Sequence, residues 1–399
     1  MKSLNINIFY SLIVFYLIAI SWSPILSSLT SFSASLFYAP IVILLIILLW
    51  YSERIKINSF LMIIFFLLLV LFITIFKDTL VYAQRFAFFS IVLLLIILIL
   101  KKESIINYTS KILTVYIIIA IIFSIISFIY AYLGFSPIFE INNPDGRINY
   151  LYLMSFSNSI FGNIIRPSFI YDEPGAFSFI ICYVVILRTM LKKNKNITLL
   201  ILIGGLITFS VTHIIILLIY LILEINKKII FLLIPILIII SILLSNQDEL
   251  KFFFDRFSLS ESGEIKADNR SGQINNFIKI ANQEIILFGN YQCEDSTINK
   301  CTDHYDMTSS PITPIYYGGI LFLFVQLLTS ILLLWIGYKN KNFRFVGLVM
   351  FLLLLQRPFY SAKGYQIMIY TTLFYSMRKT LQQKKKNIHY ITKGFNYVK

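Results

Sequence analysis

The stretch TSKILTVYIIIAIIFSIISFIYAYL, residues 109–133, decides the fold. Its only charged residue, Lys111, lies near its beginning, and the rest is apolar apart from scattered Ser, Thr and Tyr. A helix needs roughly 20 such residues to cross the hydrocarbon core of a bilayer. The stretch therefore predicts a transmembrane helix.

The chain as a whole repeats this pattern. Hydrophobic residues make up 58% of the composition and charged residues only 13%, which is more apolar surface than a soluble fold could bury. We therefore expect an all-α integral membrane protein, a polytopic bundle of about 12 transmembrane helices with two larger outer loops. The two stretches on either side of Ser210 could instead form one long broken helix. The further apolar stretches lie at residues 4–22, 34–51, 57–76, 80–100, 174–191, 197–209, 211–225, 229–245, 312–338, 343–356 and 365–377.

This pattern divides the chain into alternating helical and loop regions. The first apolar stretch ends at Trp22, Ser23 and Pro24 without the small-x-small cleavage site of a signal peptide, so we expect it to be retained. The predicted regions are helices one to five (1–133), a first large loop (134–173), helices six to nine (174–245), a second large loop (246–311), helices ten to twelve (312–378) and a basic tail (379–399).

Lysine and arginine predict the orientation, because short cytoplasmic loops retain positive charge. Most of the 34 basic residues fall in alternate segments, so both termini should be cytoplasmic and both large loops should lie outside. The net charge of +15 then reflects topology. A nucleic-acid-binding surface would gather its charge on one folded face, so we expect no nucleic-acid partner. The tail cluster Lys384, Lys385 and Lys386 suits anionic membrane lipids instead.

Any chemistry should occur on the outer face, because the predicted inner loops are short. The sequence contains no nucleotide-binding glycine loop. This argues against an ATP-driven pump and against a transferase that uses sugar nucleotides at the inner face. We expect no cofactor and no metal.

The first large loop ends in Arg166-Pro-Ser-Phe-Ile-Tyr-Asp-Glu-Pro-Gly, which contains two candidate residues. Glu173 followed by Pro174 is typical of a helix start, because the helix dipole favours an acid there and proline is tolerated in the first turn. Arg166 could be an anchor at the membrane interface or a ligand for an anion. Both alternatives stay open for each residue.

The second large loop contains an arginine followed by an amphipathic segment. Arg270 precedes an apolar stripe that predicts a helix ending before Leu287-Phe-Gly289. Further along, Cys293 and Cys301 lie eight positions apart and suit a local disulfide in an oxidising compartment. The stripe consists of Ile274, Phe277, Ile278 and Ala281.

Histidines offer a second type of candidate. His304, in the second large loop, could accept a proton near neutral pH, or it could be an ordinary exposed loop residue. His213 lies within a predicted span, where it is most simply a core histidine that bonds a neighbouring helix, although ionisable groups in membranes are often functional.

Further cations lie between the last two predicted spans. Arg357 and Lys363 would share the outer face with Arg166 and Arg270. Several cations at that depth could hold a pyrophosphate, and arginine supplies paired donors for it.

Taken together, these residues resemble the O-antigen polymerase and ligase superfamily of bacterial inner membranes. The resemblance rests on the many spans, the large late loop with Arg270, the Leu287-Phe-Gly289 segment, and His304 before a span that opens with Tyr316-Tyr-Gly-Gly319. The segment 166–177, with its Asp-Glu-Pro-Gly, is similar to the polymerase side of that group. The chain departs from the family at Gln273 and Ile274, where an aromatic residue is common, and at Asn290, where a second glycine often lies.

The resemblance implies a specific activity. Such polymerases transfer a growing glycan from undecaprenyl pyrophosphate onto a new lipid-linked repeat unit at the periplasmic face of the inner membrane. By this resemblance Arg166 and Arg270 would bind the pyrophosphate, and His304 or Glu173 would activate the acceptor hydroxyl. The implied partners are the undecaprenyl-pyrophosphate-linked oligosaccharide, a chain-length-determining co-polymerase and a flippase.

Two alternatives belong to other classes. An O-antigen ligase, which passes finished polymer to the lipid A core, would have similar loops. A polysaccharide flippase or other transporter would also have about 12 spans, but it would place its charges inside the bundle around a cavity. Here the predicted spans carry few charges, and the outer loops hold the candidate residues.

Overall fold

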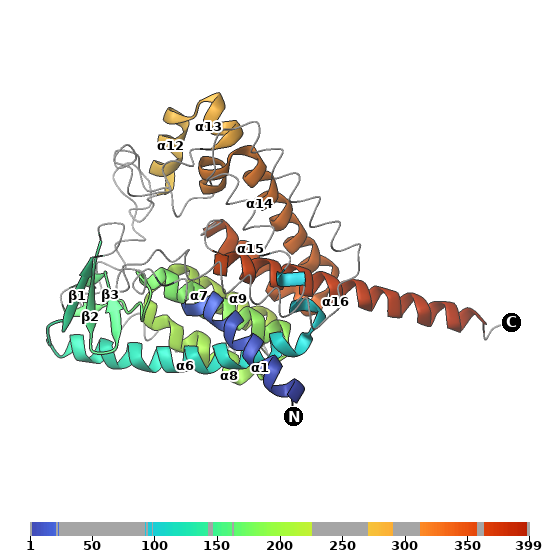
Figure 1. Ribbon diagram of the computed structural model, residues 1–399, viewed down its shortest axis with the longest axis horizontal. Helices are drawn as coiled ribbons and strands as arrows, with labels where there is room; N and C mark the ends of the chain where they lie inside the picture. Colours follow the sequence, from blue (N-terminus) through green and yellow to red (C-terminus); the bar gives the residue numbers. More distant parts are fainter. Residues whose placement is uncertain are drawn as a thin grey trace.

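The computed structural model describes residues 2–20, 23, 92, 95–97, 99–142, 147–161, 163–225, 270–289, 312–356 and 363–396, which are mostly helical (Figure 1). The predicted helical fold class is confirmed for these residues, whereas the predicted twelve spans also depend on residues outside them. Short helical turns are η1 (Tyr16–Ile20), η2 (Gly205–Thr208) and η4 (Lys341–Phe343). The helices are α1 (Lys2–Phe15), α6 (Glu103–Tyr132), α7 (Pro174–Met190), α8 (Lys195–Gly204), α9 (Val211–Glu224), α12 (Arg270–Ile280), α13 (Gln283–Phe288), α14 (Thr313–Lys339), α15 (Arg344–Gln356) and α16 (Lys363–Asn396).

Several predicted boundaries match the helices. α7 begins at Pro174 with Glu173 in the capping position, as the Glu-Pro pair predicted. α14 and α15 lie within a residue or so of the apolar stretches 312–338 and 343–356. α16 differs from its prediction, because the helix continues from Lys363 to Asn396 and takes in most of the expected basic tail.

Two of the described helices, α6 and the Gly318–Lys339 part of α14, are long and apolar enough to cross a membrane. In both, the buried face carries small and polar residues among its apolar ones, while the exposed face carries large apolar residues, the reverse of what a helix exposes in water. Lipid as the surrounding solvent explains this inversion, because small residues allow helices to pack closely. Buried positions include Thr114, Ser124, Ser127, Gln326, Thr329 and Ser330, and exposed positions include Ile119, Ile122, Ile129, Phe324, Ile331 and Trp335.

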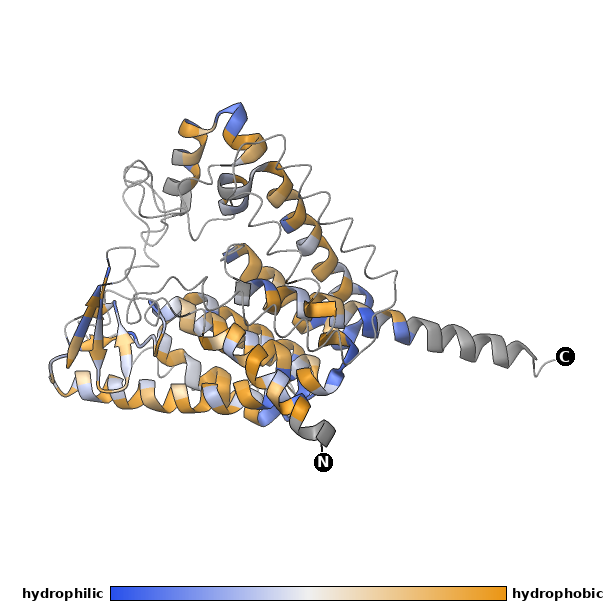
Figure 2. Ribbon diagram, viewed as in Figure 1, coloured by the Kyte–Doolittle hydropathy of each residue, from blue (hydrophilic) through white to orange (hydrophobic). Residues whose placement is uncertain are grey.

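α7 forms the centre of the bundle. Almost all of its residues are buried, as expected for a helix that is apolar on every side. Around it lie α1, α6, α8, α9, α15 and the first part of α16, whose buried residues form one continuous core. Figure 2 shows hydrophobic colour along most of these helices.

The first large loop folds into two small sheets, which the sequence analysis did not predict. One sheet contains β1 (Phe139–Asn142), β2 (Ile148–Tyr152) and β3 (Ser155–Ser157), all antiparallel. The other pairs β4 (Ile160–Phe161) with β5 (Ile164–Ile165). One face of β2, with Tyr150 and Tyr152, packs on the carboxyl end of α6. The loop is therefore a folded cap at that end of the bundle (Figure 1).

The amino end of α6 gathers basic residues from other helices. The Glu103 carboxylate accepts hydrogen bonds from the Tyr375 hydroxyl at 2.6 Å and from Lys379 Nζ at 2.9 Å. Lys193 Nζ donates to Asn107 Oδ1 at 3.0 Å. The lysine-rich turn after α7 and the basic part of α16 therefore lie at the end of α6 opposite to the small sheets.

Candidate functional site

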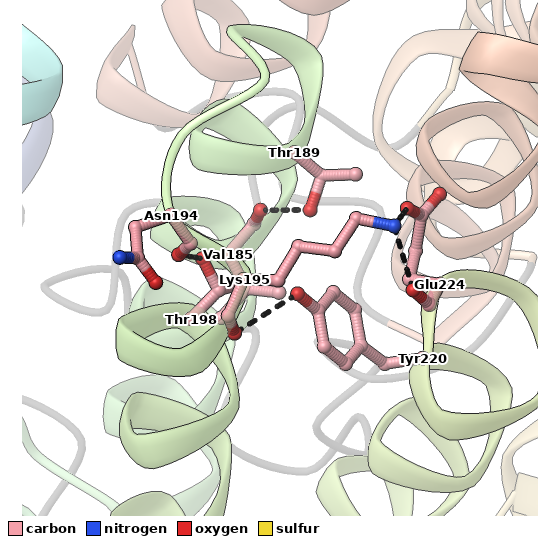
Figure 3. Close-up of polar contacts among 7 residues, drawn as sticks. All are labelled: Val185, Thr189, Asn194, Lys195, Thr198, Tyr220 and Glu224. Atoms are coloured by element: carbon pink, nitrogen blue, oxygen red, sulfur yellow. Dashed lines mark hydrogen bonds and ion pairs between the residues drawn. The ribbon is translucent and has the colours of Figure 1, made fainter. Parts of the chain in front are cut away.

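Helices α8 and α9 form a hairpin whose open end is closed by polar contacts (Figure 3). Lys195 Nζ bonds both the carboxylate and the carbonyl oxygen of Glu224, at 3.1 and 2.6 Å. The Tyr220 hydroxyl donates to the Lys195 carbonyl at 3.3 Å, and Asn194 caps α8. The first residue of α8 thus meets the last residue of α9, so the two helices fold back on each other. The alternative of one long broken helix is wrong.

Arg166 holds the closed tip of this hairpin. Its Nε donates to the Thr208 carbonyl at 3.1 Å, and its Nη2 donates to the Phe209 carbonyl at 3.2 Å. Phe209 adopts the left-handed conformation, with φ of 47°, where the chain reverses. The last carbonyls of a helix have no partner within the helix, and here the guanidinium supplies one. Arg166 therefore ties the cap to the hairpin, and its predicted pyrophosphate contact stays a prediction.

His213, on α9, connects the two arms of the hairpin and contacts α7. Its Nε2 lies 2.8 Å from the Leu202 carbonyl, so Nε2 donates and Nδ1 can accept from the Ser178 hydroxyl at 3.2 Å. Gly205 makes room for the ring, since a Cβ there would overlap the imidazole. The interpretation of His213 as a core histidine that bonds a neighbouring helix is confirmed.

An ionic cluster lies where the cap joins α7. The Arg147 guanidinium contacts the Asp172 carboxylate at 3.4 Å and the Glu173 carboxylate at 3.5 Å. The side chain of Arg147 is 44% exposed, whereas Asp172 and Glu173 are 19% and 25% exposed. A nearby guanidinium stabilises the negative charge of these carboxylates. The cluster thus places the Glu173 carboxylate at the N-cap of a buried helix.

Tyr171, next to this cluster, belongs to the core. An outer-loop tyrosine such as Tyr171 could in principle stack on a sugar ring, but its side chain is 0% exposed. Its hydroxyl donates to the Ala19 carbonyl at 2.8 Å and lies 3.1 Å from the Tyr116 hydroxyl. Burial raises the pKa of Tyr171 well above its usual value. A neutral, buried Tyr171 anchors the cap to η1, so the stacking role is wrong.

Two segments that carried the family resemblance meet at α14. Gly319, with φ of 66°, interrupts that helix, and a Cβ at this position would overlap the Leu287 carbonyl. Phe277 packs edge-on against Tyr316, with ring centroids 6.4 Å apart. The Leu287-Phe-Gly289 segment therefore seats against the Tyr316-Tyr-Gly-Gly319 segment, which fixes where α12 and α13 lie.

The predicted amphipathic helix is present in a shorter form. α12 ends at Ile280, and α13 starts after Asn282, whose side chain caps it by accepting from the Ile285 amide at 2.7 Å. Phe277 is buried as expected. Ile278 is 67% exposed, so the apolar stripe is only partly buried.

The predicted site residues lie in different parts of the protein. Arg166 and Glu173 belong to the cap, at the hairpin tip and in the ionic cluster respectively. Arg270 and Lys363 are the first residues of α12 and α16. Arg147 was not among the predicted site residues, although an arginine in the same loop as the Asp-Glu pair was a usable signal. His304, Arg357, Cys293 and Cys301 lie outside the described residues.

Comparison with known proteins leaves the family open. No protein-family model matches the chain, and no curated protein matches it significantly. Among the described residues, no group of three or more His, Cys, Asp or Glu side chains could hold a metal ion. The function must therefore be argued from the cap and its ionic cluster.

Proposed function

We propose that the protein is an O-antigen polymerase of a bacterial inner membrane, a glycosyltransferase that acts on lipid-linked oligosaccharides at the periplasmic face. The observation that carries the proposal is the ionic cluster of Arg147, Asp172 and Glu173, which a folded cap holds at one end of an apolar bundle. A lipid-linked substrate presents its sugars at that level, directly outside the hydrocarbon layer.

The orientation follows from the distribution of charge. Lys193, Lys195 and Lys379 lie at the end of the bundle opposite to the cap. Cytoplasmic ends of membrane proteins are enriched in lysine and arginine. The cap is then periplasmic, both termini are cytoplasmic, and the full chain contains about 12 membrane helices counted with the hairpin arms.

The proposed reaction is a glycosyl transfer between two lipid-linked substrates. The acceptor hydroxyl oxygen attacks the anomeric carbon of the growing glycan, and the bond from that carbon to the pyrophosphate oxygen breaks. Glu173, charged beside Arg147, takes the proton of the hydroxyl as a general base. Undecaprenyl pyrophosphate leaves with the electron pair, and Arg270, Arg357 and Lys363 neutralise it, with His304 as an alternative base.

The test is the lipopolysaccharide banding pattern of the source strain. Deletion of the gene should leave core that carries a single repeat unit, and the wild-type gene should restore the ladder. Glu173→Gln should restore about a hundredfold less polymer or none, because a positioned general base contributes on the order of 10²-fold or more. Equal amounts of membrane-inserted variant and wild-type protein are the control.

Each other result has a definite meaning. Core without any repeat unit would indicate a ligase or flippase, and an unchanged ladder after deletion would reject the proposed function. A normal ladder from Glu173→Gln would remove Glu173 from the reaction and leave His304 as the candidate base.

A further inference from the structure

Asn149 on β2 carries a fully buried side-chain amide. The side chain is 0% exposed, and within the described part of the chain neither Oδ1 nor Nδ2 has a hydrogen-bond partner. Most other buried polar atoms in that condition are hydroxyls on helices, such as Ser124 and Thr371, which can turn toward backbone carbonyls of their own helix. A side-chain amide in a strand has no backbone carbonyl of the same turn to which it could donate. A buried amide that is left unpaired is unfavourable, so its retention calls for a physical reason.

The strand geometry shows which way Asn149 faces. Tyr150 and Tyr152 pack on α6, and side chains alternate between the two faces of a strand. Asn149 therefore lies on the face turned away from α6, opposite Ile141 in the register of β1 and β2. Arg147 lies two residues before Asn149, so by the same alternation its side chain extends from the same face of the sheet. Because Arg147 contacts Asp172 and Glu173, the buried amide and the ionic cluster share one face of the cap.

We propose that Asn149, Arg147, Asp172 and Glu173 form a binding site for the hydroxyl groups of the acceptor sugar. This inference rests on the proposed function and says which substrate the cluster holds. A sugar hydroxyl is both donor and acceptor, and a side-chain amide offers both complements. The guanidinium adds donors and the carboxylates add acceptors.

The charge of the cluster favours the neutral acceptor sugar over the anionic pyrophosphate leaving group. One guanidinium and two carboxylates sum to a net charge of −1, which repels a pyrophosphate but not a neutral sugar. The pyrophosphate would bind instead near the cations of α12 and α16, Arg270 and Lys363. The acceptor hydroxyl would then lie beside Glu173, the group that takes its proton.

The experiment uses the full-length purified protein with the lipid-linked repeat unit as acceptor. Asn149→Leu should raise the KM for this acceptor about tenfold, with kcat changed less than about twofold, because a site built to bond a hydroxyl loses affinity when one partner is removed. The Tm of Asn149→Leu should stay equal or rise, since leucine replaces an unpaired buried amide. The matched control is Asn142→Leu, an exposed asparagine on the neighbouring strand β1, which should keep both KM and Tm.

Opposite results overturn the inference. An unchanged KM in Asn149→Leu rejects the site, and a lower Tm with unchanged KM identifies Asn149 as structural. Asn149→Ala repeats the test with a smaller residue if the leucine variant does not fold. If wild-type protein shows no polymerisation, the proposed function fails separately. Saturation-transfer NMR with the free repeat-unit oligosaccharide then decides the site, because equal signals from wild type and Asn149→Leu reject it and a lost signal in the variant supports it.

Discussion

At the scale of single residues, Arg166 has two candidate roles that a sequence cannot separate. It was expected at the outer face as an anion ligand or an anchor, and its guanidinium bonds the Thr208 and Phe209 carbonyls. A basic residue before a proline does not reveal which backbone it will meet some 40 residues later in the chain. Arg147 shows the same limit, because its partners Asp172 and Glu173 lie 25 and 26 residues later in the chain.

We predict that Arg166→Ala destabilises the protein as well as reducing polymer. The change leaves two carbonyls at the hairpin tip without their donor, which costs about 1–3 kcal/mol, and it should lower Tm in detergent. The Tm of Arg166→Lys should lie between those of Arg166→Ala and wild type, because lysine keeps the charge but lacks the planar guanidinium. Arg147→Lys, a change at an exposed ion pair, is the control and should leave Tm nearly unchanged. An unaltered Tm in Arg166→Ala would mean that the residue serves the substrate alone.

At the scale of elements, helices were more predictable than strands. The Glu-Pro pair that starts α7 and the apolar run that forms α6 are local signals, and both elements appeared where they were expected. The strands β1 and β2 are only four and five residues long, and their stability comes from pairing with each other and packing on α6. The alternation in Phe139-Glu-Ile-Asn142 was a usable but weak signal.

We predict that Gly319→Ala displaces α12 and α13 from α14. An added methyl group would overlap the Leu287 carbonyl, and the backbone at φ of 66° and ψ of −166° suits glycine almost alone. The two effects together should cost a few kcal/mol. Limited proteolysis should cut the variant within residues 270–289 faster than wild type. Gly337→Ala, whose methyl group would meet the Arg344 carbonyl at 3.4 Å, is the tolerated control.

We predict that the α8–α9 hairpin crosses the membrane in spite of its short arms, because its open end at Lys195 lies opposite to the cap and its tip bonds Arg166 of the cap. Each arm contains 14 residues, or about 21 Å of helix, which is short of the roughly 30 Å hydrocarbon core, so the bilayer should thin around it. In a cysteine-free background, Asn142→Cys and Val211→Cys should react with an impermeant maleimide added outside, and Asn196→Cys only after permeabilisation. A Val211→Cys variant that stays unlabelled from outside would show that the tip does not reach the outer face.

At the scale of the whole molecule, the two ends of the bundle differ in charge and in fold. Lysines and arginines gather at the amino end of α6, and the sheets with their ionic cluster lie at the other. Periodicity and charge counts predicted this polarity, because both are properties of local sequence. The sequence did not predict that the cap, the hairpin tip and α7 would converge, because those contacts form only in the folded chain.

We predict the orientation of the full chain by reporter fusion. Alkaline phosphatase, which is active only outside the cytoplasm, should be active when fused after Asn142 and inactive when fused after Asn196. Green fluorescent protein at the carboxyl terminus should fluoresce, because it folds in the cytoplasm. Phosphatase activity after both positions, or a dark carboxyl-terminal fusion, would contradict the orientation.

The inverted faces of α6 and α14 have a consequence for how the protein is made. Each of these helices is made before a helix that packs on it, α7 for α6 and α15 for α14, so part of its polar face first meets hydrocarbon. Thr114 on α6 and Thr329 on α14 donate to carbonyls four residues earlier in their own helices, at 2.6 and 2.7 Å. These hydrogen bonds within each helix satisfy the hydroxyls before the neighbouring helices have packed against it. The inserted helices can therefore pack against one another after translation is complete.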